Sequence, residues 1–212
     1  MYHLAKKHFK TADPRLHEAA KQWDIEDIVV SADLFRDIVW TIVGQQLSST
    51  AANTIYARFE KLFPRGRVTP EQILALADEQ MRASGLSGAK TRAIKNVAAA
   101  VRQGELDMKK IAALPDAEVV ATLTRVKGIG PWTAEMVLMF SLGRTDIFSP
   151  GDLGLRKGVV ALYDLKQMPD EKKLLKIAKA WSPYRTYAAR VLWKLADKNT
   201  QRVARKRPGN KK

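Results

Sequence analysis

The feature that most constrains the fold is a glycine-rich break between two apolar segments, within residues 123–142. Glycine adopts a positive φ at little steric cost, so Gly128 and Gly130 allow the chain to reverse within a few residues. Pro131 suits the first position of the next helix, where its missing N–H is no loss. The N–H groups around Gly128, Gly130 and Trp132 then lie at the positive end of a helix dipole. The sequence therefore predicts two helices joined by a tight turn that can bind a phosphate.

A second helix start follows the predicted hairpin. The run Ser149-Pro150-Gly151 interrupts the chain, and helical spacing of apolar residues resumes at Leu153 and continues to about Tyr163. Asp152 therefore occupies the position of an N-cap. Taken alone, an aspartate at such a position needs no role beyond capping the helix.

Together these two segments resemble a known family. The run Gly128-Ile129-Gly130-Pro131-Trp132-Thr133-Ala134, followed by Pro150-Gly151-Asp152, resembles the helix-hairpin-helix and Gly/Pro-Asp signature of the HhH-GPD superfamily of DNA glycosylases. Within that superfamily the chain is most similar to the 3-methyladenine DNA glycosylase II group. The resemblance extends from about Leu34 to Trp193, and it implies two helical lobes with DNA bound at the cleft between them.

The residues themselves also favour an all-α fold. Apolar residues recur at helical spacing, as in Leu34, Ile38 and Ile42, and no stretch shows sustained strand-like alternation. We expect a single glycosylase unit over residues 1–212. Its parts are a central lobe at about 31–145 with the hairpin at 117–142, a second lobe formed by 1–30 and 146–200, and a basic tail at 201–212. The last helix is expected to end near Ala196, and the tail either adds non-specific attraction to DNA or has no function.

Composition limits the partners and the chemistry. The chain has 37 Lys and Arg against 22 Asp and Glu, a net charge of +15, which favours polyanions such as DNA, although ribosomes or anionic membrane surfaces also fit. It has no cysteine, which excludes disulfides, thiol nucleophiles and the iron–sulfur cluster of many endonuclease III-like relatives. No apolar run approaches the ~18 residues of a membrane span, and the N-terminus lacks a signal-peptide core. We expect a monomeric, cytoplasmic or nuclear protein that binds double-stranded DNA and no membrane.

The resemblance assigns catalysis to Asp152. Hydrolysis of an N-glycosidic bond develops positive charge on the sugar; a nearby carboxylate stabilises that charge and can orient or deprotonate the attacking water. Asp146, the nearest other carboxylate, does not match the family position. Trp132 stands where bifunctional relatives carry a Schiff-base lysine, and neither Lys127 nor Lys157 matches that position. We therefore predict a monofunctional glycosylase without lyase activity.

Four residues match the family's pocket for the flipped base. Trp132 and Trp193 can attract alkylated purines, which carry positive charge, through cation–π interactions. Met136 and Leu153 stand where some relatives have tyrosine, which leaves the breadth of substrates open. The alternative is that both tryptophans belong to the core.

Gln45, Gln46 and Leu47 match the loop that fills the gap left by the flipped base in the family. Such a plug needs a side chain long enough to reach the base stack, and Gln46 is favoured over Leu47. The alternative is a polar connection between two helices, with Leu47 in the core.

The hairpin is expected to hold two kinds of ion. Gly128, Gly130 and Thr133 are expected to bind a DNA phosphate through backbone N–H groups and a hydroxyl. In related hairpins the turn carbonyls also hold Na⁺ or K⁺, and the candidates here are those of Arg125, Lys127 and Ile129. No other cofactor is expected. Arg185 matches a family position whose role is either structural or a DNA contact.

The leading interpretation is a base excision repair glycosylase that removes alkylated purines, such as 3-methyladenine and 7-methylguanine, by water attack. The alternatives are a glycosylase for another lesion, such as uracil or hypoxanthine, and a DNA-binding hairpin protein without chemistry.

Overall fold

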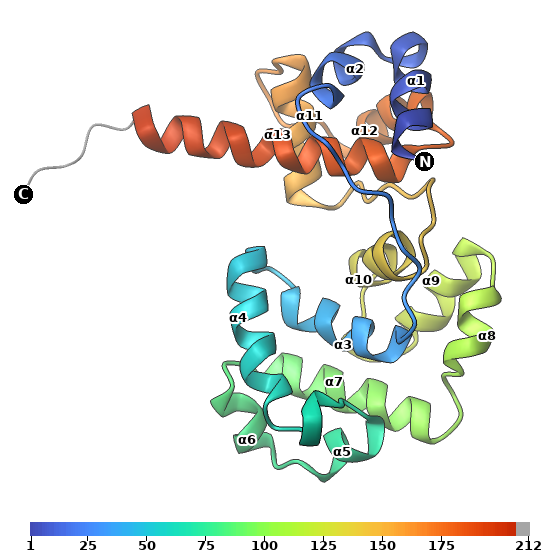
Figure 1. Cartoon of the computed structure of the whole chain (residues 1–212), viewed down its shortest axis with the longest axis vertical. Helices are drawn as coiled ribbons and strands as arrows, with labels where there is room; N and C mark the ends of the chain where they lie inside the picture. Colours follow the sequence, from blue (N-terminus) through green and yellow to red (C-terminus); the bar gives the residue numbers. More distant parts are fainter. Residues whose placement is uncertain (207–212) are drawn as a thin grey trace, which may run out of the picture. The chain divides into compact units, whose positions relative to one another are not determined.

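A computed structural model of the protein describes residues 1–206, with side chains for residues 1–200. Within residues 1–206 all regular secondary structure is helical and no strand occurs, which confirms the all-α prediction (Figure 1). Contacts divide the chain into two compact units. Unit 1 comprises Met1–Ile28 and Arg144–Lys212, and unit 2 comprises Val29–Gly143.

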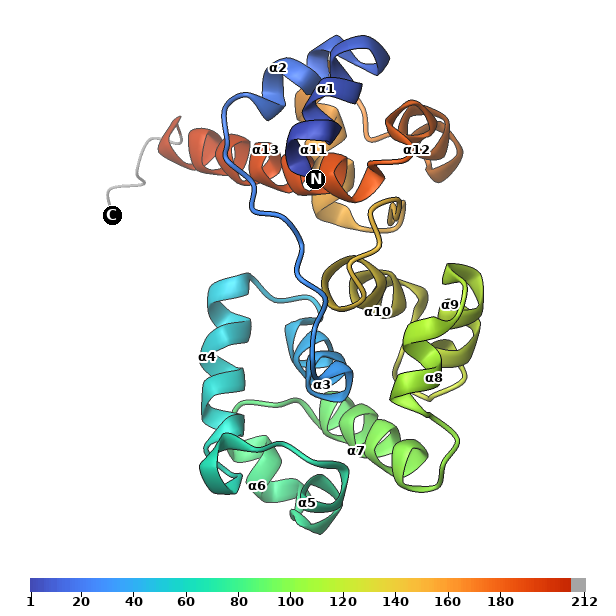
Figure 2. The ribbon, with the colours of Figure 1, turned by 45° about the vertical axis from the view of Figure 1, so that its right-hand side comes forward.

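Unit 2 is built around its longest helix, α7. Its helices are α3 (Leu34–Gly44), α4 (Ser49–Glu60), the 3₁₀ turn η1 (Pro64–Gly66), α5 (Pro70–Ala75), α6 (Asp78–Ala83), α7 (Gly88–Arg102), α8 (Met108–Ala113), α9 (Asp116–Thr124), α10 (Pro131–Met136) and the π-helical turn η2 (Val137–Ser141). Helix α7 begins at the side-chain cap of Ser87 and buries Ile94 and Val97. It contacts α3, α5 and α6, whose arrangement around it is visible in Figure 2. Helix α10 of the hairpin contacts α3 in turn, so the hairpin and the loop after α3 share one apolar core.

Unit 1 joins the N-terminal helices to the C-terminal ones. Its helices are α1 (Tyr2–Ala12), α2 (Pro14–Ala20), α11 (Leu153–Tyr163), α12 (Glu171–Ala178), the 3₁₀ turn η3 (Lys179–Trp181) and α13 (Arg185–Lys206). The buried carboxylate of Asp13 caps α2 through the Leu16 N–H at 3.1 Å. It also accepts hydrogen bonds from the Trp181 indole at 2.8 Å and from the Tyr163 hydroxyl. One buried carboxylate between α1 and α2 therefore bonds side chains of α11 and η3.

The helices differ from the sequence-based predictions in three places. No helix is predicted before Asp13, but α1 forms there and buries Tyr2, Ala5 and Phe9 at helical spacing. The second arm of the hairpin turns π-helical at Val137–Ser141 rather than continuing as α-helix. The last helix continues through Lys206 instead of ending near Ala196, so the predicted tail is helical over 201–206.

The longer helix has a simple cause. Residues 197–206 contain no glycine or proline, and the first helix breaker is Pro208, which disfavours helix at the residue before it. Residues 207–212 of the predicted tail lie outside the described part of the chain. Within the described residues, no helix combines the length and the apolar character needed to cross a membrane.

Candidate active site and DNA-binding elements

Asp152 lies at the N-cap of α11, as its sequence position predicted. Its Oδ1 accepts a hydrogen bond from the backbone N–H of Leu155 at 2.7 Å. The same oxygen accepts a second hydrogen bond from Nε1 of Trp193, on α13, at 2.9 Å. Two donors from two helices converge on one carboxylate oxygen, so they restrict the rotation of this partly exposed side chain.

Gly154 leaves the space in which Trp193 reaches Asp152. A Cβ at position 154 would lie 2.7 Å from Cδ1 and 2.9 Å from Nε1 of Trp193, and 3.0 Å from Oδ1 of Asp152. Four residues later, a Cβ at Gly158 would lie 2.4 Å from the carbonyl oxygen of Leu192. Because residues four apart share one face of a helix, these glycines let α11 and α13 approach closely. Sequence reasoning missed both, although a Gly-x-x-x-Gly spacing inside a predicted helix was the available signal.

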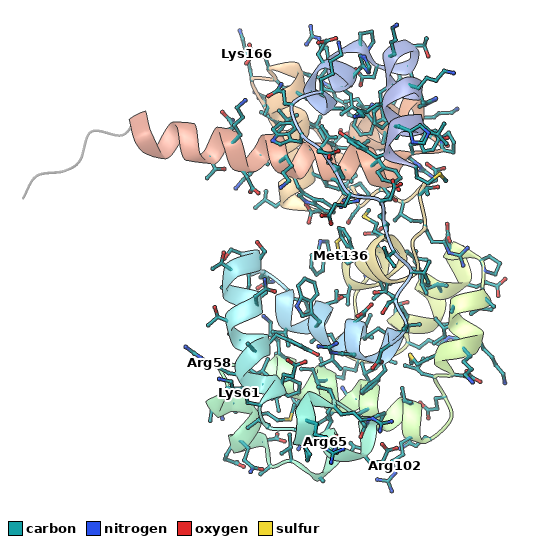
Figure 3. The ribbon with its side chains drawn as sticks, in the orientation of Figure 1. Arg58, Lys61, Arg65, Arg102, Met136 and Lys166 are labelled. Carbon is teal, nitrogen blue, oxygen red and sulfur yellow. The ribbon has the colours of Figure 1, made fainter. Side chains whose placement is uncertain are left out.

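Trp193 is half-buried rather than a core residue, and its indole N–H is donated to Asp152. This orienting contact was not anticipated; the sequence had suggested only a base pocket or the core. Leu153, directly after Asp152, is 56% exposed. The other two residues predicted for the base pocket lie in unit 2, on α10, where Trp132 is partly buried and Met136 is buried. Met136 is labelled on this helix in Figure 3. The two units therefore supply two pocket candidates each, and the pocket itself stays a prediction.

Asp146, the rival carboxylate, is engaged in a structural ion pair. Arg185 donates from Nε to Oδ1 at 2.7 Å and from its terminal nitrogen to Oδ2 at 3.1 Å, and the Ser182 hydroxyl donates to Oδ2 at 2.8 Å. Burial raises the pKa of the Asp146 carboxyl, but the hydrogen bonds from Arg185 and Ser182 outweigh it, and the net pKa is lowered. Of the two roles left open for Arg185, the structure supports the structural one.

The hairpin forms as predicted, with one correction. Helix α9 gives way to a turn in which the Ile129 N–H bonds the Val126 carbonyl at 3.0 Å, and α10 starts at Pro131. Gly128 has φ +106°, and a Cβ there would lie 2.4 Å from Cβ of Ala93 on α7. Both the backbone conformation and the lack of space therefore require glycine at this position. Gly130 has φ −97° and serves as the N-cap of α10, so its predicted conformational role is wrong.

The Thr133 hydroxyl, expected to bind a DNA phosphate, is buried beside the loop after α3, and its role as a phosphate ligand stays a prediction. Thr133 is 2% exposed, and its Oγ1 accepts a hydrogen bond from Nε2 of Gln45 at 2.9 Å. The same amide nitrogen donates to the Gly128 carbonyl at 3.3 Å. Gln45 therefore ties the loop after α3 to the hairpin instead of projecting into solvent. The phosphate-binding N–H groups of the hairpin stay a prediction.

The two other residues of the predicted plug are on the surface. Gln46 is exposed, and Leu47 is 38% exposed, so the alternative that places Leu47 in the core is wrong. Gln46 also has a positive φ of 58°, which is uncommon for a residue with a side chain. The loop thus presents two side chains of sufficient length at its tip.

The candidate cation site is only partly suited to an ion. The Lys127 carbonyl accepts a hydrogen bond from Nδ2 of Asn96 at 2.8 Å, which occupies part of its acceptor capacity. The carbonyls of Arg125 and Ile129 stay candidates. Among the described residues, no group of three or more His, Asp or Glu side chains is placed to hold a metal ion.

Comparison with known proteins agrees with this arrangement. Residues 39–183 match the family model of the HhH-GPD superfamily base excision DNA repair proteins. DNA-3-methyladenine glycosylase 1 of Schizosaccharomyces pombe is 39% identical over 162 residues, which cover 76% of this chain and 71% of that protein.

Two solved structures have the same fold. A 3-methyladenine DNA glycosylase from fission yeast, in complex with abasic DNA, has a TM-score of 0.83 at 33% identity and covers 90% of this chain and 95% of its own. A DNA-3-methyladenine glycosidase from Bacillus halodurans has a TM-score of 0.75 at 39% identity, with 92% of this chain and 91% of its own covered. The matched residues include both the hairpin and Asp152, and the chain belongs to the HhH-GPD superfamily of base excision DNA repair proteins.

Proposed function

We propose that the protein is a monofunctional DNA glycosylase that hydrolyses the N-glycosidic bond of alkylated purines, of the 3-methyladenine and 7-methylguanine type. The observation that carries the proposal is the carboxylate of Asp152, held at a helix N-terminus by Leu155 N–H and Trp193 Nε1. The relatives named DNA-3-methyladenine glycosylase support the substrate class. The abasic DNA bound by the fission-yeast structure corresponds to the product of base release.

Asp152 acts on the sugar and on the water. As the bond to the base breaks, positive charge builds on the sugar, and the carboxylate stabilises it electrostatically. The attacking water loses a proton, and the carboxylate is the group that accepts it or orients the water. Both tasks need a carboxylate that does not reorganise during the reaction, which the two converging hydrogen bonds provide.

The absence of a lyase step follows from Trp132. A lyase forms a Schiff base through an amine at the hairpin position where this chain has Trp132, whose indole has no nucleophilic amine. Lys127 and Lys157, both exposed, lie outside that position. Borohydride reduction during turnover is therefore expected to trap no covalent enzyme–DNA adduct; a trapped adduct would contradict the monofunctional assignment.

Recognition needs the base outside the stack, at a free-energy cost of a few kcal/mol. Exposed Gln46 and Leu47 are suited to fill the vacated space, and the hairpin N–H groups near Gly128 are suited to hold the backbone. Trp132 and Trp193 offer aromatic faces to a cationic purine, an attraction worth ~0.5–2 kcal/mol. A protein acting on duplex DNA works in a compartment that contains DNA, the bacterial cytoplasm or the nucleus.

The test is base release from N-methylated DNA, followed by chromatography, with wild type and Asp152→Asn. Asparagine caps helices as well as aspartate does, so the variant keeps the fold and loses the charge. We expect a loss of at least ~100-fold in base release with DNA affinity retained. The matched control is Asp170→Asn, because Asp170 caps α12 of the same unit through Lys173 N–H at 2.7 Å. This control is expected to release bases like wild type.

The alternatives give different results. A panel of single-lesion duplexes distinguishes the substrates. Release of uracil or hypoxanthine without release of methylated purines would change the assigned substrate class but not the role of Asp152. Binding without release of any base would favour a DNA-binding hairpin protein without chemistry. Equal activity of wild type and Asp152→Asn would overturn the assignment of the catalytic residue.

A further inference from the structure

The turn that follows α3 is held in a strained conformation. Gln45 has φ −49° and ψ 127°, Gln46 has φ 58°, and the Leu47 N–H bonds the Gly44 carbonyl at 3.1 Å. These are the features of a type II β-turn, whose third position favours glycine because φ is positive there. A glutamine at that position costs free energy, so something in the surrounding structure must hold the turn.

Lys90, in the first turn of α7, stabilises the turn after α3 by hydrogen bonds. Its Nζ donates hydrogen bonds to the carbonyls of Val43 and Gln45, both at 2.8 Å. On the other side, the Gln45 amide bonds Gly128 and Thr133 of the hairpin. The turn is therefore fixed between α7 and the hairpin, all within unit 2.

The bond to the Gln45 carbonyl decides the turn type. Type I and type II turns differ by a flip of the central peptide, whose carbonyl here belongs to Gln45. A cation bonded to that carbonyl keeps it in the type II orientation and so keeps the φ of Gln46 positive. Without the cation the central peptide can flip, which gives Gln46 a negative φ and redirects its side chain.

The position of Lys90 on α7 also indicates that its ammonium group is stabilised by the end of α3. A cation in the first turn of a helix is disfavoured by the dipole of that helix, here α7, whereas at the last carbonyls of α3 it is favoured. The side chain is partly buried, and burial lowers the pKa of its ammonium group. The ammonium's hydrogen bonds to the carbonyls of Val43 and Gln45, at the end of α3, offset these unfavourable contributions.

We propose that Lys90 is a positioning residue for DNA insertion: it locks the turn so that exposed Gln46 and Leu47 are presented to the gap left by a flipped base. The inference rests on the proposed function, because a plug is needed only where a base leaves the stack. A preformed plug lowers the entropy that must be lost when the loop is ordered on DNA.

The decisive variant is Lys90→Met, which keeps the apolar stem and removes the donors. Single-turnover release is measured for 7-methylguanine paired with cytosine, and for the same lesion opposite an abasic-site analogue, where less pairing opposes extrusion. We expect a loss of about tenfold on the paired substrate, equivalent to ~1.4 kcal/mol, and a loss within about twofold on the unpaired one. Lys90→Arg, which keeps donors, is expected to restore the paired rate.

The matched control is Lys95→Met on the same helix, because the partly buried Lys95 pairs with Asp78 of α6 and not with the turn. It removes the same charge and is expected to leave both rates unchanged. Equal losses on both substrates for Lys90→Met, together with a lower melting temperature, would overturn the proposal and assign Lys90 to stability alone.

A second variant and a second signal separate this proposal from the proposed function. In a Gln46→Gly/Leu47→Ala background, Lys90→Met is expected to change the paired-to-unpaired ratio no further, and an undiminished loss would contradict the proposal. The fluorescence of 2-aminopurine placed beside an abasic analogue reports insertion without any chemistry. If the wild-type protein changes this fluorescence but releases no base, the glycosylase assignment is contradicted. The proposal for Lys90 still predicts that Lys90→Met loses the fluorescence change.

Discussion

Asp152 in unit 1 and Gln46 in unit 2 are both fixed, but by opposite means. Asp152 has φ −71°, an ordinary value, and its side chain is held because two glycines let α11 and α13 approach closely. Gln46 has φ 58°, a strained value, and its turn is held by Lys90, which donates to the Gln45 carbonyl, and by the Gln45 amide, which donates to the hairpin. The close contact between α11 and α13 leaves no room for an added atom, so we expect the position of Asp152 to be lost when a side chain is enlarged there. The turn around Gln46 depends on hydrogen bonds, so we expect its conformation to be lost when the donors are removed.

The largest expected effect comes from Gly154→Ala. The added Cβ would meet Trp193 and the Oδ1 of Asp152 at 3.0 Å or less, so Trp193 must move and the carboxylate loses a donor. We expect base release to fall by at least ~100-fold in single-turnover assays, because a misplaced reacting group loses this much.

Gly151→Ala is the steric control for that variant. A Cβ there would come no closer than 4.0 Å to Glu171, an ordinary contact, so activity is expected to be retained. If Gly154→Ala retained wild-type activity as well, close packing would not be what holds Asp152.

A smaller effect is expected from Trp193→Phe. Phenylalanine keeps an aromatic face for the base and removes the N–H that bonds Asp152 at 2.9 Å. We expect the maximal rate to fall about tenfold with little change in affinity for lesion DNA, since the lost bond orients a charged group. A rate unchanged by Trp193→Phe and lost by Trp193→Ala would assign the residue to stacking alone.

These contacts also explain what could and could not be predicted from the sequence. The hairpin and the cap at Asp152 depend on neighbours in sequence, and the local rules for Gly128, Pro131 and Asp152 found them. The Trp193–Asp152 bond joins residues 41 apart, and the Gln45–Thr133 bond joins residues 88 apart. No local pattern specifies such partners, which is why neither hydrogen bond could be predicted from the sequence.

Lys90 was missed for the same reason. Its side chain acts on a helix end that lies 45 to 47 residues earlier in the chain. The last helix is a different case, because α13 was predicted too short although its residues favour helix up to the position before Pro208. The basic composition of this segment indicates a tail, whereas its helix propensity predicts the helix that the structure has over residues 197–206.

Gln46→Gly is expected to stabilise the fold while it impairs insertion. Glycine removes the strain of the positive φ, which we expect to raise the free energy of unfolding by about 1 kcal/mol, measured by urea denaturation. Gln45→Gly is the contrasting variant: it gains no relief at φ −49° and loses both bonds to the hairpin, so it should lower stability. Equal changes for the two variants would show that Gln46 is not strained.

The smallest expected effect is the pH dependence contributed by Asp146. Hydrogen bonds from Arg185 and Ser182 give its carboxyl a lowered pKa in the folded state despite the opposing effect of burial. A group with a lowered folded pKa stabilises the fold above its unfolded pKa, near 4, and this stability is lost as the pH falls through the folded value. Asp146→Asn should therefore lose about 1 kcal/mol or less at pH 7, since the pair is partly exposed and solvent screens part of its attraction, and the difference from wild type should shrink toward pH 3. Urea denaturation across this range gives the two curves, and parallel curves would mean that the ion pair with Arg185 contributes nothing to stability.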